Sequence, residues 1–280
     1  MTAKSQSGTR HPAAAGGTGS AVGEEVLAGL AQELAAAART RTPVRLLSER
    51  VPGLSLPDAY RIQQINVRQQ VAQGARIAGH KIGLTSAAMQ KQMGIHEPDS
   101  GVVIHRMVAA SGARLRSADF MNPRIETEIA FRLGRDIARP CGPDAVRKAV
   151  AEVFLSFEIL DTHFRSWNIT LVDSIADNAA CAGVITGSPV SFTPSWDLAQ
   201  EQITAEADGT AVARGEGRDI LGDPLQALSW LTHRLPGLGT TLRAGDIILA
   251  GSVHASLPLT PGTTFRATST RLPAVQVRAL

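Results

Sequence analysis

The chain has 280 residues, of which 44% are hydrophobic and 19% charged, a composition that predicts a globular protein with a substantial core in one large or two modest domains. The formal net charge is only +3 and the lysines and arginines are dispersed, so nucleic acid is not expected as a partner. No apolar run reaches the roughly 20 residues of a membrane span, and the 2 cysteines are too few for a disulfide scaffold, so we expect a cytoplasmic protein with free thiols and no membrane partner.

The chain is expected to divide into a tail, a helical region and a β-rich domain. Residues 1–22 are dominated by Gly, Ala, Ser and Thr, which bury too little apolar surface to fold, so a disordered tail is predicted. Residues 23–75 form the helical region, in which Ser55 and Asp58 stand at the spacing of a capping box. Two helices are predicted there, over residues 24–40 and 55–73. Residues 76–280 consist of short alternating segments separated by Gly and Pro, which predict the β-rich domain.

Lys81 lies in a segment, residues 77–84, whose alternation predicts a β-strand. On a strand, Gly79 and Gly83 share the face of Lys81, and two glycines leave room for another group to approach the lysine. These residues alone do not decide between a functional lysine and one that faces water. His80 falls on the opposite face, where we expect a core or interface histidine whose polar atoms are satisfied.

Two other segments are interpreted as structural from their residues alone. Residues 94–101 contain Pro98 and Gly101, which predict a loop, and Asp99 taken by itself is expected to be a turn residue rather than a catalytic one. The run of small side chains over residues 174–183 lets a backbone approach a ligand, but tight packing between elements is expected for most of it.

A pair of glutamates stands on one face of the strand predicted over residues 123–131. Glu126 and Glu128 alternate with Ile125 and Ile129, so the two carboxylates point the same way, together with Arg124. Neighbouring carboxylates repel, and a buried pair would need a proton or a cation between them. On this segment alone, an edge strand with a solvated polar face is the more expected interpretation.

Glu158 changes this balance. The segment 153–160 predicts a strand on which Glu158 has Phe154 and Leu160 as neighbours on its own face. A carboxylate among large apolar residues is costly unless it finds a cation or a proton, so a functional role is favoured.

Three glutamates on strand faces, without a Cys or His cluster, predict an all-oxygen site suited to Mg²⁺ or Mn²⁺ rather than zinc. Such an ion leaves positions open for the carboxylate and the C2 oxygen of a 2-oxo or 2-enol acid. We expect Lys81 to move a proton during tautomerisation, provided that burial and the nearby cation lower its pKa.

Six motifs carry a family resemblance: GHKIGLT at 79–85, EPDSG at 97–101, PRIETEI at 123–129, EILD at 158–161, ADNA at 176–179 and GDIIL at 245–249. In this order and spacing, from about residue 24 to the end, the chain resembles the hydratase/decarboxylase family of bacterial aromatic meta-cleavage pathways, within the fumarylacetoacetase superfamily.

The resemblance implies an α+β fold, with a mixed, rolled β-sheet or barrel as the metal-binding catalytic domain behind a helical N-terminal part. It assigns the metal to Glu126, Glu128 and Glu158, proton transfer to Lys81, and delivery of water to Asp99. The implied activity is that of a hydratase: a 2-hydroxy-2,4-dienoate of the 2-keto-4-pentenoate type becomes a 4-hydroxy-2-oxo acid. A homo-oligomer is implied, which could associate with a pathway aldolase or decarboxylase.

Two alternatives stay open: a decarboxylase of 2-oxo-3-hexenedioate (4-oxalocrotonate), and a non-catalytic assembly partner of a pathway enzyme. Asp99 favours the hydratase, because decarboxylases of the family tend to lack this acid. A superfamily hydrolase that cleaves C–C bonds is less expected, because no Glu/His pair is placed to activate water.

Candidate substrate-binding residues within the matched segments and the loop that follows them are Asp177, Asn178 and Ser252. Departures from the family pattern at Ser100, at His163 and in the loop 251–256 put the substrate in doubt more than the metal. His254, in that loop, is expected to be a surface histidine, although contact with a substrate tail is the alternative.

Overall fold

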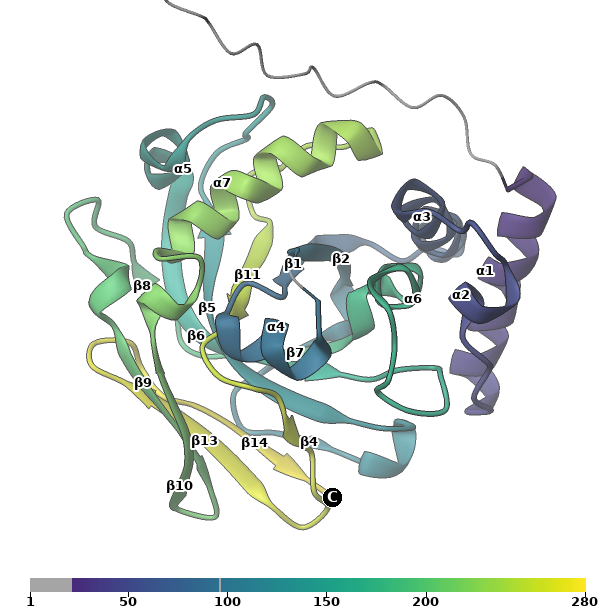
Figure 1. The fold of residues 1–280 in the computed structure, drawn as a ribbon. Coiled ribbons are helices and arrows are strands. Elements are labelled where there is room, and N and C mark those ends of the chain that lie inside the picture. Colours follow the sequence, from purple (N-terminus) through teal and green to yellow (C-terminus); the bar gives the residue numbers. More distant parts are fainter. Residues whose placement is uncertain (1–21, 96) are drawn as a thin grey trace, which may run out of the picture.

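The computed structural model describes residues 22–95 and 97–280 (Figure 1). The predicted tail, residues 1–22, therefore lies almost entirely outside the described residues. Within these two ranges no helix is both long and apolar enough to cross a membrane.

Four of the seven α-helices in the described ranges, α3, α4, α6 and α7, begin at a residue whose side chain caps the helix. Ser55 and Asp58 form the predicted capping box at the start of α3, and Thr170 and Asp173 form another at the start of α6. The bounds are α1 Glu24–Thr40, α2 Leu47–Arg50, α3 Leu56–Ala72, α4 Ala87–Met93, α5 Pro143–Ala149, α6 Leu171–Ala176 and α7 Pro224–Arg234. The two long helices predicted for the N-terminal region are confirmed by α1 and α3.

Strands of the described ranges form two sheets. The larger, nine-stranded sheet follows the order β2-β1-β11-β5-β6-β7-β3, with β12 on β5 and β8 on β6, and the five-stranded sheet follows β10-β9-β13-β14-β4. The bounds are β1 Ile77–Gly83, β2 Asp99–Ile104, β3 Val108–Ala110, β4 Ala113–Leu115, β5 Arg124–Leu133, β6 Val150–Leu160, β7 Cys181–Thr186, β8 Val190–Ser191, β9 Gln202–Ala207, β10 Thr210–Glu216, β11 Ile247–Ser252, β12 Leu257–Pro258, β13 Thr264–Ser269 and β14 Val275–Ala279.

The larger sheet is rolled, because β2 and β7 contact each other although several strands separate them in the sheet. The contact between β2 and β7 is called the β2–β7 seam below. Asn178, just before β7, links the two strands there: its side chain accepts from the N–H of Val102 at 2.8 Å and donates to the carbonyl of Val102 at 3.0 Å. Figure 1 shows the five-stranded sheet against one side of the roll, α1 to α3 beside α6, and α7 next to α5. The predicted α+β fold with a mixed, rolled sheet is confirmed.

Apolar side chains fill two main regions. One core lies between the sheets and includes Ile125, Ile129 and Phe131, the back face of β5. A second joins α1 and α3 to α6, so the helical region shares buried surface with the segment that precedes β7. Because α6 also contacts β2, this packing lies against the larger sheet.

The predicted loop over residues 94–101 is wrong at its end. Asp99 is the first residue of β2, where it pairs with Gly83, and Val102 pairs with His80. Turn-forming Pro98 and Gly101 suggested a loop, but Val102, Val103 and Ile104 extend the segment into a ladder with β1. A tertiary pairing has overridden the local turn signals.

Candidate functional site

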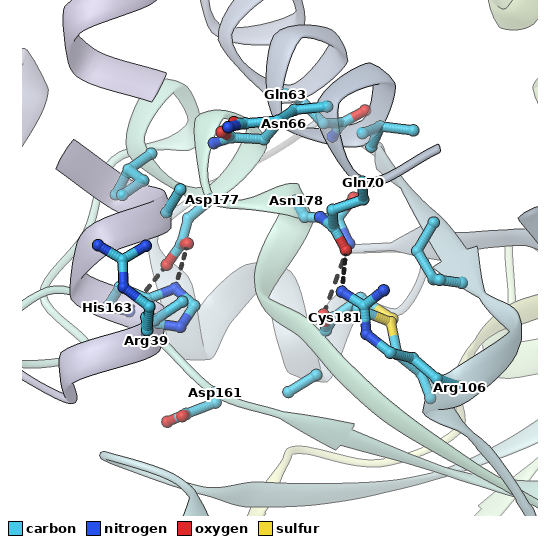
Figure 2. A pocket seen from close by; sticks show the side chains of 18 of the residues that line it. Arg39, Gln63, Asn66, Gln70, Arg106, Asp161, His163, Asp177, Asn178 and Cys181 are labelled. Carbon is cyan, nitrogen blue, oxygen red and sulfur yellow. Dashed lines mark hydrogen bonds and ion pairs between the residues drawn. The ribbon is translucent and has the colours of Figure 1, made fainter. Parts of the chain in front are cut away.

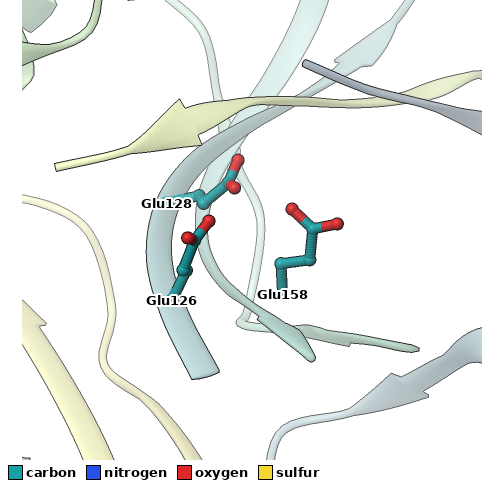
Figure 3. A group of neighbouring side chains, drawn as sticks. All are labelled: Glu126, Glu128 and Glu158. Atoms are coloured by element: carbon teal, nitrogen blue, oxygen red, sulfur yellow. The ribbon is translucent and has the colours of Figure 1, made fainter. Parts of the chain in front are cut away.

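Three glutamates meet on the inner face of the rolled sheet (Figure 3). Strands β5 and β6 are antiparallel, and their register places Glu126 directly opposite Glu158, with Glu128 two residues along β5 on the same face. One carboxylate oxygen of each lies within 4.8 Å of the others. The residues are 4%, 0% and 0% exposed in chain order, so the interpretation of this strand as a solvated edge is wrong.

The surroundings of the three glutamates disfavour the ionised form of their carboxyl groups. Burial, and then the neighbouring charge of Glu158, raises the pKa of Glu126 to about 8. Burial and the charges of Glu158 and Glu126 likewise raise the pKa of Glu128. Four buried oxygens have no hydrogen-bond partner among the described residues: Glu126 Oε1, Glu128 Oε1, Glu158 Oε1 and Glu158 Oε2. The group is therefore suited to an added cation.

The backbone of β11 orients one of these carboxylates. The pairing of β11 with β5 shifts register between Leu249 and Ser252, and Gly251 takes a φ of 112° there. In this conformation its N–H donates to Glu128 Oε2 at 2.7 Å. A Cβ at Gly251 would lie 1.8 Å from Thr85 Oγ1, so only glycine fits.

Lys81 reaches the cluster from β1. It is 3% exposed, and its Nζ lies 3.5 Å from Glu158 Oε1 and 3.9 Å from Asp99 Oδ1. Burial disfavours its charge, but the negative charges of Glu158 and Asp99 outweigh burial and raise its pKa. Without a cation the carboxylates around the ammonium are not neutralised, so the lowering expected with a bound cation stays a prediction. The interpretation as a lysine facing water is also wrong.

Asp99 completes the group. It is 2% exposed, its Oδ2 accepts a hydrogen bond from Ser174 Oγ at 3.0 Å, and its Oδ1 is buried without a hydrogen-bond partner among the described residues. Gly83 makes the approach to Lys81 possible, since a Cβ there would lie 2.2 Å from Asp99 Oδ1 and 2.8 Å from Lys81 Nζ. Five side chains from four strands, those of Lys81, Asp99, Glu126, Glu128 and Glu158, thus share one buried space.

The other predicted binding residues make structural contacts. Ser252 pairs with Glu128 across the β11–β5 ladder, and its Oγ donates to the carbonyl of His254 at 2.6 Å. His254 is 6% exposed, with Nε2 at 2.9 Å from Thr127 Oγ1, so the expected surface histidine is wrong. Thr127 belongs to the face of β5 opposite the glutamates, which places this imidazole behind the site.

Asp177 and Asn178 line a cavity of about 630 Å³ between α1, α3 and the β2–β7 seam (Figure 2). Asp177 accepts from the backbone N–H of His163 at 2.8 Å and lies 2.5 Å from its Nδ1. Burial lowers the pKa of His163, but the charge and hydrogen bond of Asp177 outweigh burial and raise it. The side chains of Asp177 and Asn178 are thus committed to His163 and Val102.

Residues 69–279 match the family model described as fumarylacetoacetate (FAA) hydrolase C-terminal. The chain belongs to this family. It is 37% identical over 237 residues to the 2-keto-4-pentenoate hydratase of Burkholderia vietnamiensis (strain G4 / LMG 22486), covering 84% of this chain and 89% of that relative. It is 33% identical over 240 residues to the 2-hydroxyhexa-2,4-dienoate hydratase of Comamonas testosteroni, covering 84% and 90%.

Among solved structures, the fold is similar to that of 4-oxalocrotonate decarboxylase from Pseudomonas putida G7, complexed with magnesium and adipate. The TM-score is 0.89 at 27% identity, and the match covers 94% of this chain and 100% of that one. The resemblance predicted from the sequence motifs is confirmed. The proteins that this chain resembles thus include both hydratases and a decarboxylase.

Two residues near this FAA hydrolase-family site were missed from the sequence. Ser174, which bonds to Asp99, stands in a small-residue run that favoured packing, and Tyr60 of α3 lies within the helix predicted over residues 55–73. No local signal distinguishes them, because Ser174 and Asp99 are 75 positions apart.

Proposed function

We propose that Glu126, Glu128 and Glu158 hold one divalent cation, Mg²⁺ or Mn²⁺. Their donors are all carboxylate oxygens, which suit these ions, and several are buried without a hydrogen-bond partner among the described residues. Lys81 is the only Lys or Arg in ion-pair contact with these carboxylates within the described ranges, so negative charge exceeds positive charge. The related decarboxylase was solved as a complex with magnesium, which supports the same assignment.

We propose hydration of a 2-hydroxy-2,4-dienoate of the 2-keto-4-pentenoate type, in aromatic catabolism, as the reaction. The observation that carries it is the free, buried Oδ1 of Asp99 beside Lys81, together with the names of the curated relatives. When bound, the cation supplies Lewis-acid polarisation of the substrate's C2 oxygen and carboxylate. Homo-oligomerisation, association with a pathway aldolase or decarboxylase, and a cytoplasmic location stay predictions.

In this mechanism Lys81 moves the proton that converts the dienol into the conjugated 2-oxo acid. Asp99 Oδ1 then takes a proton from water while the water oxygen forms a bond to C4 and the C3=C4 electron pair moves toward C3 and the carbonyl. Protonation of C3 gives the 4-hydroxy-2-oxo acid. Because both groups are almost fully buried, their charges act in a setting of low polarity.

The test compares two substrates on the same protein, stripped of metal and then given Mg²⁺ or Mn²⁺. We expect metal-dependent loss of the ultraviolet band of 2-hydroxypenta-2,4-dienoate, with a 4-hydroxy-2-oxo acid as product, and no CO₂ from 2-oxo-3-hexenedioate. CO₂ release without consumption of the dienoate would establish the decarboxylase, a second candidate that the structural match favours. Inertness toward both would favour the non-catalytic assembly partner.

A glycine tests whether the spacing of Lys81 and Asp99 matters. In Gly83→Ala the new Cβ would stand 2.2 Å from Asp99 Oδ1, so the two side chains must separate. We expect hydration to fall by about 10-fold or more, since small displacements of reacting groups cost that much. Calorimetric Mg²⁺ binding should persist, because the glutamates lie on β5 and β6. The control is Gly183→Ala on β7, where the nearest atom would be 3.4 Å away; equal losses in both variants would contradict the prediction.

A further inference from the structure

Two side chains of helix α3 form hydrogen bonds with Ser100, the residue that follows Asp99. Tyr60 is 2% exposed; its hydroxyl accepts from the N–H of Ser100 at 3.2 Å and lies 3.3 Å from Ser100 Oγ. One helical turn on, Gln63 Nε2 donates to the carbonyl of Ser100 at 2.9 Å. The backbone of Ser100 is therefore fixed on both sides of its Cα by buried side chains of a single helix.

Helix α6 holds the carboxylate itself. Ser174 Oγ donates to Asp99 Oδ2, and the same Gln63 amide also donates to the carbonyl of Ile175 at 3.1 Å, which ties α6 to α3. With Oδ2 occupied, Oδ1 is the oxygen without a hydrogen-bond partner among the described residues, and the space above Gly83 lets it face Lys81. The orientation of Asp99 is thus set by two helices that do not contribute any of the three glutamates.

Tyr60 is also coupled electrostatically to this carboxylate. Burial, and then the negative charge of Asp99, raises the pKa of Tyr60, which keeps the phenol neutral. The guanidinium of Arg234, at the end of α7, lies 4.1 Å from the centroid of the Tyr60 ring, in a cation–π contact. A tyrosine that served only to fill the core would not need its hydroxyl at this position.

We infer that Ser174 and Tyr60 are positioning residues for Asp99: they hold its Oδ1 toward Lys81 so that this oxygen receives the proton of the added water. The inference rests on the proposed function, in which Asp99 acts in the hydration step. It predicts that the two side chains matter for the addition of water but not for proton movement by Lys81. A purely structural role predicts no such separation.

The experiment measures two reactions in the Mg²⁺-loaded enzyme. The first is hydration of 2-hydroxypenta-2,4-dienoate. The second is deuterium exchange at C3 of 2-oxopentanoate, in which a C3–H bond breaks, the protein base takes the proton, and a deuteron from solvent restores C3; no water adds. The variants are Ser174→Ala and Tyr60→Phe. The control is Ser229→Ala on α7. This variant removes another buried hydrogen bond, in which Ser229 Oγ donates to the carbonyl of Cys141 at 2.7 Å.

In Ser174→Ala we expect kcat for hydration to fall about 10- to 100-fold, the range for losing a hydrogen bond to a charged group, with KM nearly unchanged. In Tyr60→Phe we expect a smaller fall of the same kind. Exchange at C3 should stay within about 2-fold of the native rate in both. Equal loss of hydration and exchange, or no loss of either, would overturn the inference. A native protein that catalyses neither reaction would instead overturn the proposed function.

A readout without turnover uses the single tyrosine of the chain. In the metal-free protein, ¹³C label at tyrosine Cζ gives one resonance, which reports Tyr60. We expect Asp99→Asn and Ser174→Ala to shift it and Ser229→Ala to leave it in place, while Mg²⁺ binding measured by calorimetry persists in Ser174→Ala. A resonance that is unmoved by Asp99→Asn would refute the coupling of Tyr60 to Asp99.

Discussion

Replacing Glu126 with glutamine is expected to abolish activity and, in the same protein, to stabilise the metal-free fold. Activity should fall by a factor of about 1,000 or more, because the cation that would stabilise negative charge on the substrate loses one of its three carboxylate ligands. The metal-free fold becomes more stable because a buried carboxyl group, whose charge is opposed by the charge of Glu158, is replaced by a neutral amide of similar size. The gain at neutral pH should be on the order of a few kcal/mol in free energy of unfolding.

The stability of the metal-free protein should depend on pH because of Glu126. The pKa of Glu126 is about 8 in the folded protein and 4.5 in the free group, so between these values the native state binds more protons than the unfolded state. The stability of the metal-free protein therefore falls as pH rises from about 4.5 to 8. The cation binds carboxylates rather than carboxylic acids, so Mg²⁺ affinity should rise over the same range.

Thermal unfolding at several pH values, with Mg²⁺ or with a chelator, measures both effects. In Glu126→Gln we expect a flatter dependence of the unfolding temperature on pH and little response to Mg²⁺. The control is Glu152→Gln, which removes a half-buried glutamate of β6 paired with Arg132 at 2.8 Å, outside the cluster. A Glu126→Gln protein that is less stable at pH 8 without metal, or that keeps native activity, would contradict the assignment.

Local alternation was sufficient to predict the faces of β5 and β6. It placed Glu126 and Glu128 on one side, and it identified Glu158 as a charge among apolar residues. Burial of the cluster could not be read from β5 alone, because a wet strand face and a metal-binding face show the same alternation. The family motifs supplied the long-range order that alternation lacks.

What the sequence did not predict depends on contacts between distant segments. The strand that begins at Asp99 was predicted as a loop because its neighbours Pro98 and Gly101 favour turns. It forms because it pairs with β1. His254 is buried because its imidazole bonds Thr127, 127 positions away, and the hold of Ser174 on Asp99 spans 75 positions. Such pairings arise from the roll of the sheet and leave no periodic signal in the chain.

Replacing Lys81 with methionine is expected to stop both hydration and C3 exchange, by about 1,000-fold or more, while Mg²⁺ still binds. Methionine keeps the length of the side chain but offers no group that accepts or donates a proton, which removes the base or acid from every proton transfer assigned to it. The ammonium now lies 3.5 Å from Glu158 Oε1. Since its removal takes a positive charge away from the carboxylates, their affinity for Mg²⁺ should hold or rise.

The comparison with the positioning residues makes this variant informative. Loss of Ser174 should separate hydration from exchange, whereas loss of Lys81 should remove both, because the proposed function assigns the proton movement between enol and keto forms to this lysine. The control is Lys148→Met, which replaces an exposed lysine of α5 that is not part of the cluster. Stopped-flow assays of both reactions and calorimetric titration with Mg²⁺ give the measurement. If exchange survived in Lys81→Met, the proton-transfer role would belong to another group; if Mg²⁺ no longer bound, the lost activity would reflect a collapsed site rather than the missing amine.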